Sequence, residues 1–272
     1  MVPPDTNTSA AAAYYDNADV AAFYRACWGG SDIHIGRYDA GDETIAEASA
    51  AMTRHLLALA GLGEGDRVLD IACGYGGTLR ELARLGCHPA GIDISQVCVD
   101  EAGRANAEAG LADWVSVDVG DFHAIESLDG AWDACVCQES IIHSNDRPQV
   151  FREVYRVLRR GGVFAFSDIL TGDGADLSMV AAAFERLGAQ AGATLQDYRD
   201  MANAAGFEIV HAEERAGDIR IHYDTLAEML GAPVEGLDPA AAARIAASIG
   251  RWQAALEGEH ITWACFVARK PG

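Results

Sequence analysis

The sequence contains little positive charge. It has 20 lysine and arginine residues against 41 aspartate and glutamate residues, so its formal net charge is −21. Lys270 is the only lysine. A surface with this charge repels nucleic-acid backbones and anionic lipids. We therefore expect no nucleic-acid partner and no membrane partner, and the acidity also suits a protein that stays hydrated in concentrated salt.

Long hydrophobic runs and metal-binding cysteine pairs are missing as well. No apolar run reaches the ~18 residues of a membrane-spanning helix, and the first dozen residues resemble a frayed tail rather than a secretory signal. Seven cysteines are spread at irregular spacings, which is typical of reduced thiols in a cytosol. Cys135 and Cys137 have no second pair at zinc-finger spacing. These absences predict a soluble, cytoplasmic protein with no metal, either a monomer or a homodimer.

From residue 67 onward, short strand-like runs alternate with helical stretches, which predicts βαβ units and a mostly parallel sheet. Seven strands are expected, at residues 67–72, 88–93, 114–119, 132–137, 162–168, 207–212 and 260–268. Helices are expected at residues 43–60, 77–85, 96–109, 148–159, 223–230 and 239–256, and after Thr194, which forms a capping box with Asp197. The expected fold class is therefore a doubly wound α/β fold with a seven-stranded sheet. We also expect the last strand to be antiparallel.

The chain is expected to divide at residue 66. Residues 1–66 would form a helical N-terminal segment that covers substrate and cofactor, and residues 67–272 would form the cofactor-binding domain. Two helical insertions, near residues 170–193 and 214–258, would lie over the carboxyl ends of the strands, where open α/β sheets bind ligands. We expect these insertions to act as a substrate lid.

A glycine-rich turn follows the first strand. Gly74 and Gly76 allow the backbone to approach a ligand, and the helix that starts beyond them offers amide hydrogens to a carboxylate or phosphate. A dinucleotide-binding fold would carry a small residue two positions after Gly77, where this chain has Leu79. The turn alone therefore indicates a cofactor site without identifying the cofactor, and it argues against an NAD-dependent oxidoreductase, which stays a distant alternative.

Acidic residues follow three successive strands and narrow the choice of cofactor. Asp93 ends the second strand, 23 residues after Asp70, where it can accept both ribose hydroxyls. Asp121 with Phe122 follows the third strand, where the pair can hold an adenine, and Glu139 stands at the end of the fourth. Residues 67–168 thereby resemble the Rossmann-like S-adenosylmethionine-dependent methyltransferases. The resemblance implies S-adenosyl-L-methionine as cofactor, bound by Asp70, Ala72, Gly74, Gly76, Asp93, Ile94, Asp121, Phe122, Gln138 and His143. Ala72 departs from the glycine of many family members and leaves less room beneath the methionine moiety.

The N-terminal segment is rich in aromatic residues and glycine. Aromatic faces attract sulfonium and ammonium groups. The run W-G-G-S-D-I-H-I-G-R-Y at residues 28–38 resembles sarcosine/dimethylglycine N-methyltransferases, as do Q-E-S-I-I-H-S at residues 138–144 and the pair His222 and Tyr223. This resemblance implies methylation of a small amino-acid-like amine, from sarcosine and dimethylglycine to glycine betaine, an osmolyte.

His143 is the first candidate for catalysis. An ammonium has no lone pair, so a group must accept or relay its proton, and a histidine suits that role. In the related phosphoethanolamine methyltransferases the histidine at this place is catalytic and paired with an N-terminal tyrosine, which implies Tyr15 or Tyr24 as partner here. The alternative is a structural histidine that closes the loop by a hydrogen bond.

The covering segments supply the candidates for acceptor binding. A zwitterionic acceptor needs a cation for its carboxylate, and Arg37 or Arg220 could provide it, although both are equally compatible with surface ion pairs. The full set of expected substrate-binding residues is Trp28, His34, Arg37, Glu139, Arg220, His222 and Tyr223. Two other functions stay open: methylation of an oxygen, sulfur, imidazole nitrogen or carbon of a natural product, and a binding module without catalysis.

Overall fold

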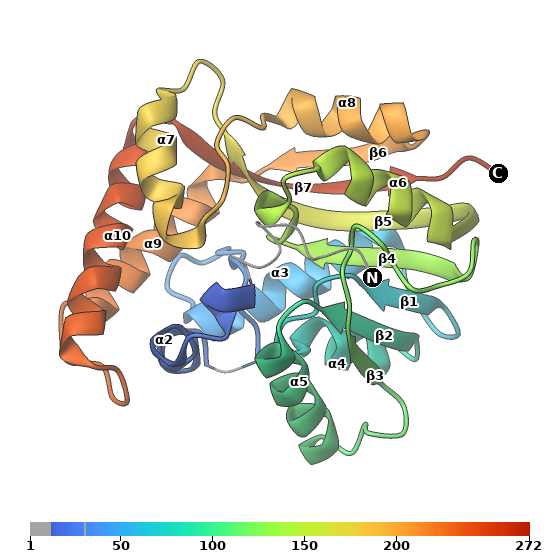
Figure 1. The fold of residues 1–272 in the computed structure, drawn as a ribbon, viewed down its shortest axis with the longest axis horizontal. Helices are drawn as coiled ribbons and strands as arrows, with labels where there is room; N and C mark the ends of the chain where they lie inside the picture. Colours follow the sequence, from blue (N-terminus) through green and yellow to red (C-terminus); the bar gives the residue numbers. More distant parts are fainter. Residues whose placement is uncertain (1–11, 30) are drawn as a thin grey trace.

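The computed structural model describes residues 12–29 and 31–272, so Gly30 and nearly all of the expected N-terminal tail lie outside the described residues. Seven strands form one sheet, in the order β3-β2-β1-β4-β5-β7-β6 (Figure 1). The strands are β1 (Arg67–Asp70), β2 (His88–Asp93), β3 (Ser116–Val119), β4 (Trp132–Gln138), β5 (Leu158–Thr171), β6 (Glu208–Glu214) and β7 (Ile261–Arg269).

The pairing of the strands confirms the expected fold class. The strands β1 to β5 pair in parallel, while β7 runs antiparallel between β5 and β6. The chain order reverses between β1 and β4, and such a switch point is where open α/β sheets bind their ligands. The described residues also contain no helix that is both long enough and apolar enough to cross a membrane.

Helices cover both faces of the sheet. They are α2 (Ala18–Trp28), α3 (Ile45–Ala60), α4 (Gly77–Arg84), α5 (Gln96–Glu108), α6 (Arg147–Val157), α7 (Leu177–Phe184), α8 (Leu195–Ala205), α9 (Ala216–Leu230) and α10 (Pro239–Glu257). On one face α6 and α8 bury an aromatic stack formed by Phe151, Phe166, Tyr198 and Phe266. On the other face Met52 and Leu56 of α3 are fully buried against the sheet. The sheet is thereby held rigidly between two apolar layers.

Local signals explain most helix boundaries. The capping box of Thr194 and Asp197 opens α8, and Thr44 with Glu47 forms a second one at the start of α3. Several boundaries differ from the expectation, and two of them lie where the insertions begin. The strand β5 extends to Thr171 rather than residue 168, because antiparallel pairing with β7 continues from Val163 to Thr171. The helix α9 begins at Ala216, seven residues before the expected start at residue 223.

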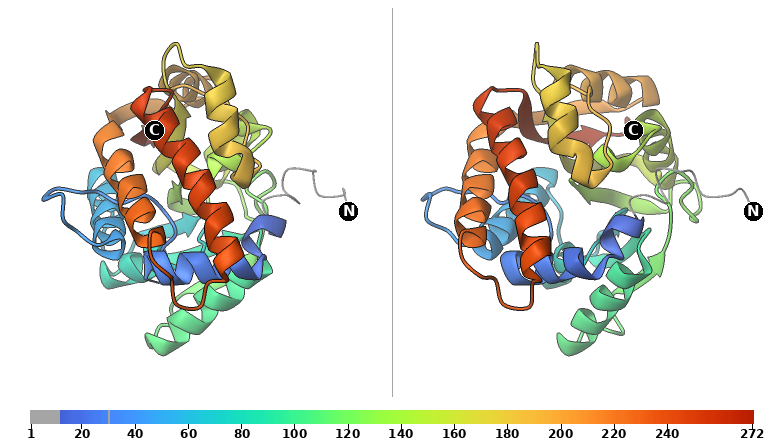
Figure 2. Two further views of the ribbon diagram at one scale, coloured as in Figure 1. Left: turned by 90° about the vertical axis from the view of Figure 1, so that its left-hand side faces the viewer. Right: turned by 60° about the vertical axis from the view of Figure 1, so that its left-hand side comes forward.

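Four helices gather beyond the carboxyl ends of the parallel strands. Figure 1 shows α2, α7, α9 and α10 together on one side of the sheet. Viewed from that side in Figure 2, α9 and α10 lie side by side, and both α9 and α7 pack against α10. These helices come from the N-terminal segment and the two insertions. That they act as a lid remains a prediction, and they are called the cover below.

Candidate active site

The glycine turn after β1 holds the first acidic group in place. Gly74 has a φ of 50°, and its N–H donates to Asp93 Oδ2 over 2.9 Å. The other oxygen of Asp93 accepts from the N–H of Ser95 over 2.9 Å. A Cβ on Gly76 would lie 3.1 Å from that of Ala102, so this glycine serves the packing of α4 on α5. Main-chain donors therefore fix Asp93 at the end of β2.

The three expected acids lie at neighbouring strand ends and differ in electrostatics. Burial raises the pKa of Asp70 to about 7 and also raises the pKa of Asp93. Asp121 is also partly desolvated, but hydrogen bonds from His123 keep its pKa below the usual range. The ring of His123 lies 2.8 Å from Asp121 Oδ1 through Nδ1 and 2.7 Å from Ser144 Oγ through Nε2. His123 and Ser144 orient Asp121, a role that no sequence motif indicated.

A cleft runs along these strand ends in two connected pockets. The wall between them contains Tyr15, Ala72, Asp93 and Ser140. The first pocket is mainly apolar and is also lined by Ile71, Ile94, Gly120, Asp121, Phe122, His123 and His143. The second is more polar and includes Asp32, His34, Asp70, Gly74, Thr78, Gln138 and Glu139. Nine of the ten expected cofactor-binding residues thus line one cleft, and Gly76 does not.

The donors and acceptors of the cleft fit S-adenosylmethionine. The first pocket offers an apolar slot for an adenine beside Phe122, and Asp93 offers acceptors for ribose hydroxyls at the junction. In the second pocket Gln138 Nε2 donates to Thr78 Oγ1 over 2.9 Å, while its buried Oε1 has no partner among the described residues. An unsatisfied buried acceptor is costly. The ammonium of a methionine moiety would satisfy it.

His143 lies on the short 3-10 turn Ile141–His143 after β4 and points toward the N-terminal segment. Its Nε2 lies 3.2 Å from the hydroxyl of Tyr15. Burial lowers the pKa of His143 to about 4, so the ring is neutral near pH 7 and can accept the Tyr15 proton. Tyr24 stacks on Tyr15 with ring centres 6.0 Å apart. Of the two candidate tyrosines, Tyr15 is therefore the one in contact with His143.

Glu139 follows β4 and is hydrogen-bonded to the strands β5 and β7 and to the N-terminal segment. Its φ of 46° is uncommon for a residue with a side chain, and such backbone is often found at functional sites. One carboxylate oxygen accepts from Ser167 over 2.6 Å and from Trp263 over 2.7 Å, and the other accepts from the N–H of Ile35 over 2.8 Å. Three donors therefore fix Glu139 and attach the N-terminal segment to the sheet.

Aromatic and histidine side chains form the wall of the cover. Trp28 contacts Tyr24 and His222 at ring-centre distances of 4.8 and 5.0 Å. His222 Nδ1 lies 3.0 Å from the hydroxyl of Tyr38, and burial lowers the pKa of His222 to about 3. Trp28, His222 and Tyr223 are buried together in this wall, while His34 lines the second pocket. Burial would lower the pKa of His34, but Asp32 raises it to about 9.

The structure places Arg37 and Arg220 away from the cleft. Gly36 lies flat on α3, where a Cβ would come within 2.3 Å of Ala48. The next residue, Arg37, pairs with Asp39 over 2.8 Å, and its Nη1 lies 2.8 Å from His55 Nδ1. Arg220 lies outside the buried stripe of α9 and pairs with Glu259 over 3.5 Å. Both arginines thus form the surface contacts that the sequence left open.

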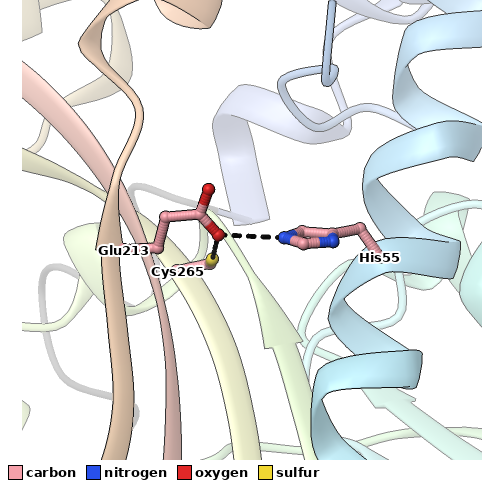
Figure 3. A group of neighbouring side chains, drawn as sticks. All are labelled: His55, Glu213 and Cys265. Carbon is pink, nitrogen blue, oxygen red and sulfur yellow. Dashed lines mark hydrogen bonds and ion pairs between the residues drawn. The ribbon is translucent and has the colours of Figure 1, made fainter. Parts of the chain in front are cut away.

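A polar cluster between α3 and the strands β6 and β7 contains His55, Glu213 and Cys265 (Figure 3). Its atoms already have partners: His55 Nε2 is 3.0 Å from Glu213, and Arg215 Nη1 is 2.6 Å from the same carboxylate. Glu213 is partly desolvated, but His55 and Arg215 lower its pKa to about 2. Because the guanidinium groups of Arg37 and Arg215 adjoin this cluster, a metal cation would be repelled there.

Arg186 is a polar residue of the cover that sequence reasoning missed. It lies on the 3-10 turn Glu185–Leu187 after α7, with its guanidinium 5.6 Å from the ring centre of Tyr14. Its Nε donates to Ser248 Oγ over 3.2 Å. A single arginine at a helix end is usually exposed, and nothing in the adjacent sequence indicates that this one points inward.

Comparisons with known proteins agree with this geometry. Residues 69–166 match the family model of a methyltransferase domain. The dimethylglycine N-methyltransferase of Parasynechococcus marenigrum is 34% identical, over 97% of this chain and 96% of that protein. The sarcosine/dimethylglycine N-methyltransferase of Halorhodospira halochloris is 32% identical, over 94% of both. A crystal structure from Galdieria sulphuraria, provisionally assigned as a sarcosine dimethylglycine methyltransferase, superposes with a TM-score of 0.86 at 30% identity and covers 94% of this chain and 99% of that one.

The likeness to these relatives extends over nearly the full chain, including the cover as well as the cofactor cleft. The expected family and the expected cofactor are both confirmed. The chain is an S-adenosylmethionine-dependent methyltransferase and belongs to the family of the sarcosine/dimethylglycine N-methyltransferases.

Proposed function

We propose that this enzyme methylates the amines of sarcosine and dimethylglycine, so that its final product is glycine betaine. The observation that carries the proposal is the hydrogen bond between Tyr15 and His143, placed at the cofactor cleft beside the aromatic wall of the cover. The two relatives above carry dimethylglycine in their names, which supports the same acceptor here. The acidic surface suits an osmolyte producer. Cytoplasmic location and a monomeric or dimeric state stay predictions.

The pair of Tyr15 and His143 can remove the proton of the acceptor. An amino-acid ammonium must lose its proton before its nitrogen lone pair can react. The Tyr15 oxygen can accept that proton while the Tyr15 hydroxyl proton moves to His143 Nε2, 3.2 Å away. Because burial lowers the pKa of His143 to about 4, the proton does not stay on the ring but passes to water, and the pair returns to its neutral state.

The cleft then aligns the acceptor for displacement. When bound, S-adenosylmethionine supplies an electrophilic methyl group on a sulfonium sulfur. The amine lone pair forms the new nitrogen–carbon bond as the carbon–sulfur bond breaks, and the thioether leaves with the electron pair. Aromatic faces such as Tyr15 and Tyr24 stabilise cationic groups by about 0.5 to 2 kcal/mol each. Alignment of the three reacting atoms supplies much of the rate.

An acceptor panel tests the proposal. Protein incubated with methyl-labelled S-adenosylmethionine should label sarcosine and dimethylglycine, and the label should end in glycine betaine. Phosphoethanolamine and small phenols serve as competing acceptors, and His143→Ala serves as a control for background transfer. If neither sarcosine nor dimethylglycine gains label while another acceptor does, the enzyme acts on that other class of substrate and the proposal is wrong.

A further inference from the structure

Arg186 places a positive charge inside the cover. Its guanidinium lies 5.6 Å from the ring centre of Tyr14 and 5.7 Å from that of Phe23, and the side chain is only partly exposed. It hydrogen-bonds the hydroxyls of Tyr14 and Ser248. These partners are neutral, so they hold the side chain in place without balancing its charge.

No acidic group in the described part of the chain pairs with this arginine. The adjacent Glu185 turns outward and pairs with Arg251, at 3.3 Å. The hydrogen-bond partners of Arg186 are the neutral hydroxyls of Tyr14, Tyr24 and Ser248. Although the sequence has 41 acidic residues, none of those that the structure describes supplies a carboxylate to this inward-facing cation. Such a charge is costly unless an anion joins it.

The turn that carries Arg186 also reaches the catalytic pair. The next residue, Leu187, makes a main-chain hydrogen bond with His143. On the other side, the Tyr14 hydroxyl lies 3.4 Å from that of Tyr24, which stacks on Tyr15. Arg186 is therefore linked to the Tyr15–His143 pair through Leu187 on one side and through Tyr14 and Tyr24 on the other.

One buried donor in this region has no acceptor among the described residues. Trp252 lies one helical turn after Ser248 on α10, and its buried Nε1 has no partner among the described residues. Its ring stacks on Tyr223 with ring centres 4.6 Å apart. A guanidinium with only neutral partners, beside a buried donor with no partner, favours an anionic group with several acceptor oxygens.

We propose that Arg186 binds the carboxylate of the amino-acid acceptor, and that this contact makes the enzyme select zwitterions over amines without an acid. The inference rests on the proposed function and adds the residue that reads the acid group. In an amino-acid acceptor the carboxylate carbon is two bonds from the nitrogen. Arg186 on this turn can therefore hold the acid while the nitrogen faces Tyr15 and His143. A guanidinium suits it because two parallel N–H groups can bind both oxygens.

The test compares two acceptors in Arg186→Gln. The acceptors are dimethylglycine and N,N-dimethylethanolamine, which has the same amine but a hydroxyl in place of the acid. We expect the KM for dimethylglycine to rise about 100-fold, with less than a threefold change in kcat/KM for N,N-dimethylethanolamine. Arg186→Lys keeps the charge without the paired donors, so its KM should rise only about tenfold.

Two controls separate recognition from a folding defect. Arg251→Gln removes a neighbouring arginine that bonds Ala182 and Glu185 at the surface, and it should leave every constant unchanged. The affinity for S-adenosylhomocysteine should be the same in wild type and in all variants. If Arg186→Gln keeps both the KM for dimethylglycine and the preference over N,N-dimethylethanolamine, the inference is wrong. A wild type inactive on sarcosine and dimethylglycine would instead overturn the proposed function, and this inference with it.

Discussion

The cofactor cleft and the cover hold their polar groups in different ways. In the cleft, main-chain N–H groups that are near in the sequence fix the acids. Ser95 donates to Asp93 and Ala72 to Asp70, each from two residues away, and Gly74 donates to Asp93 from 19 residues away. In the cover, side chains from distant segments hold one another, as Arg186 and Tyr14 do. The cleft is thus built into the strand ends, whereas the cover is built from tertiary contacts, and substitutions in the two regions should have separable effects.

The largest expected effect is a loss of cofactor affinity, which concerns the cleft and not the cover. We expect Asp93 to accept two hydrogen bonds from the ribose, each worth about 2 kcal/mol with a charged acceptor, so in Asp93→Ala the Kd for S-adenosylhomocysteine should rise about 1,000-fold. Isothermal calorimetry measures it. Asp118→Ala removes an exposed acid from the edge strand β3 and should change nothing. Equal affinity of Asp93→Ala and wild type would place the ribose elsewhere.

The next largest effect is on kcat and concerns His143, which lies between the cleft and the cover. Loss of the proton acceptor in His143→Ala should lower kcat about 100-fold, because general base catalysis typically contributes at least that much. Single-turnover methyl transfer to dimethylglycine measures it. Tyr15→Phe should lose a similar factor if the two residues form one relay. A full kcat in His143→Ala would show that alignment alone drives the reaction, and the proposed relay would then be wrong.

The smallest expected effect is on the pH dependence of kcat/KM. Burial lowers the pKa of His143 to about 4, so the ring stays neutral from about pH 5.5 upward and adds no ionisation in that range. Burial and Tyr24 raise the pKa of Tyr15, so its hydroxyl stays protonated. Of the Tyr15–His143 pair and the acceptor, only the acceptor amine then titrates. Asp70, with a pKa of about 7, lines the second pocket of the cleft, so the assay uses saturating S-adenosylmethionine, and kcat/KM for dimethylglycine should then rise tenfold per pH unit between about pH 5.5 and 8. A hundredfold rise per unit below about pH 6.5 would mean that His143 titrates as an ordinary histidine.

The same contrast explains what the sequence could predict. Asp93 and the capping box at Thr194 act through main-chain groups a few positions away or at an adjacent strand end, so spacing alone located them. The role of Arg37 was beyond such reasoning, because its contact with His55 depends on how the segment around Gly36 packs on α3. Arg186 was missed for a related reason. Its partners, Tyr14 and Ser248, lie far away in the sequence, and only folding brings them together.

Tyr15 belongs to the wall of both pockets and also contacts His143. One side chain thus borders both pockets, and we expect spent cofactor to leave only when this wall opens. We expect an opened wall to release the acceptor too, which makes the enzyme distributive: each methyl transfer would end in dissociation. With excess sarcosine, free dimethylglycine should accumulate before glycine betaine appears. Glycine betaine formed without any lag would show that the acceptor stays bound through both transfers.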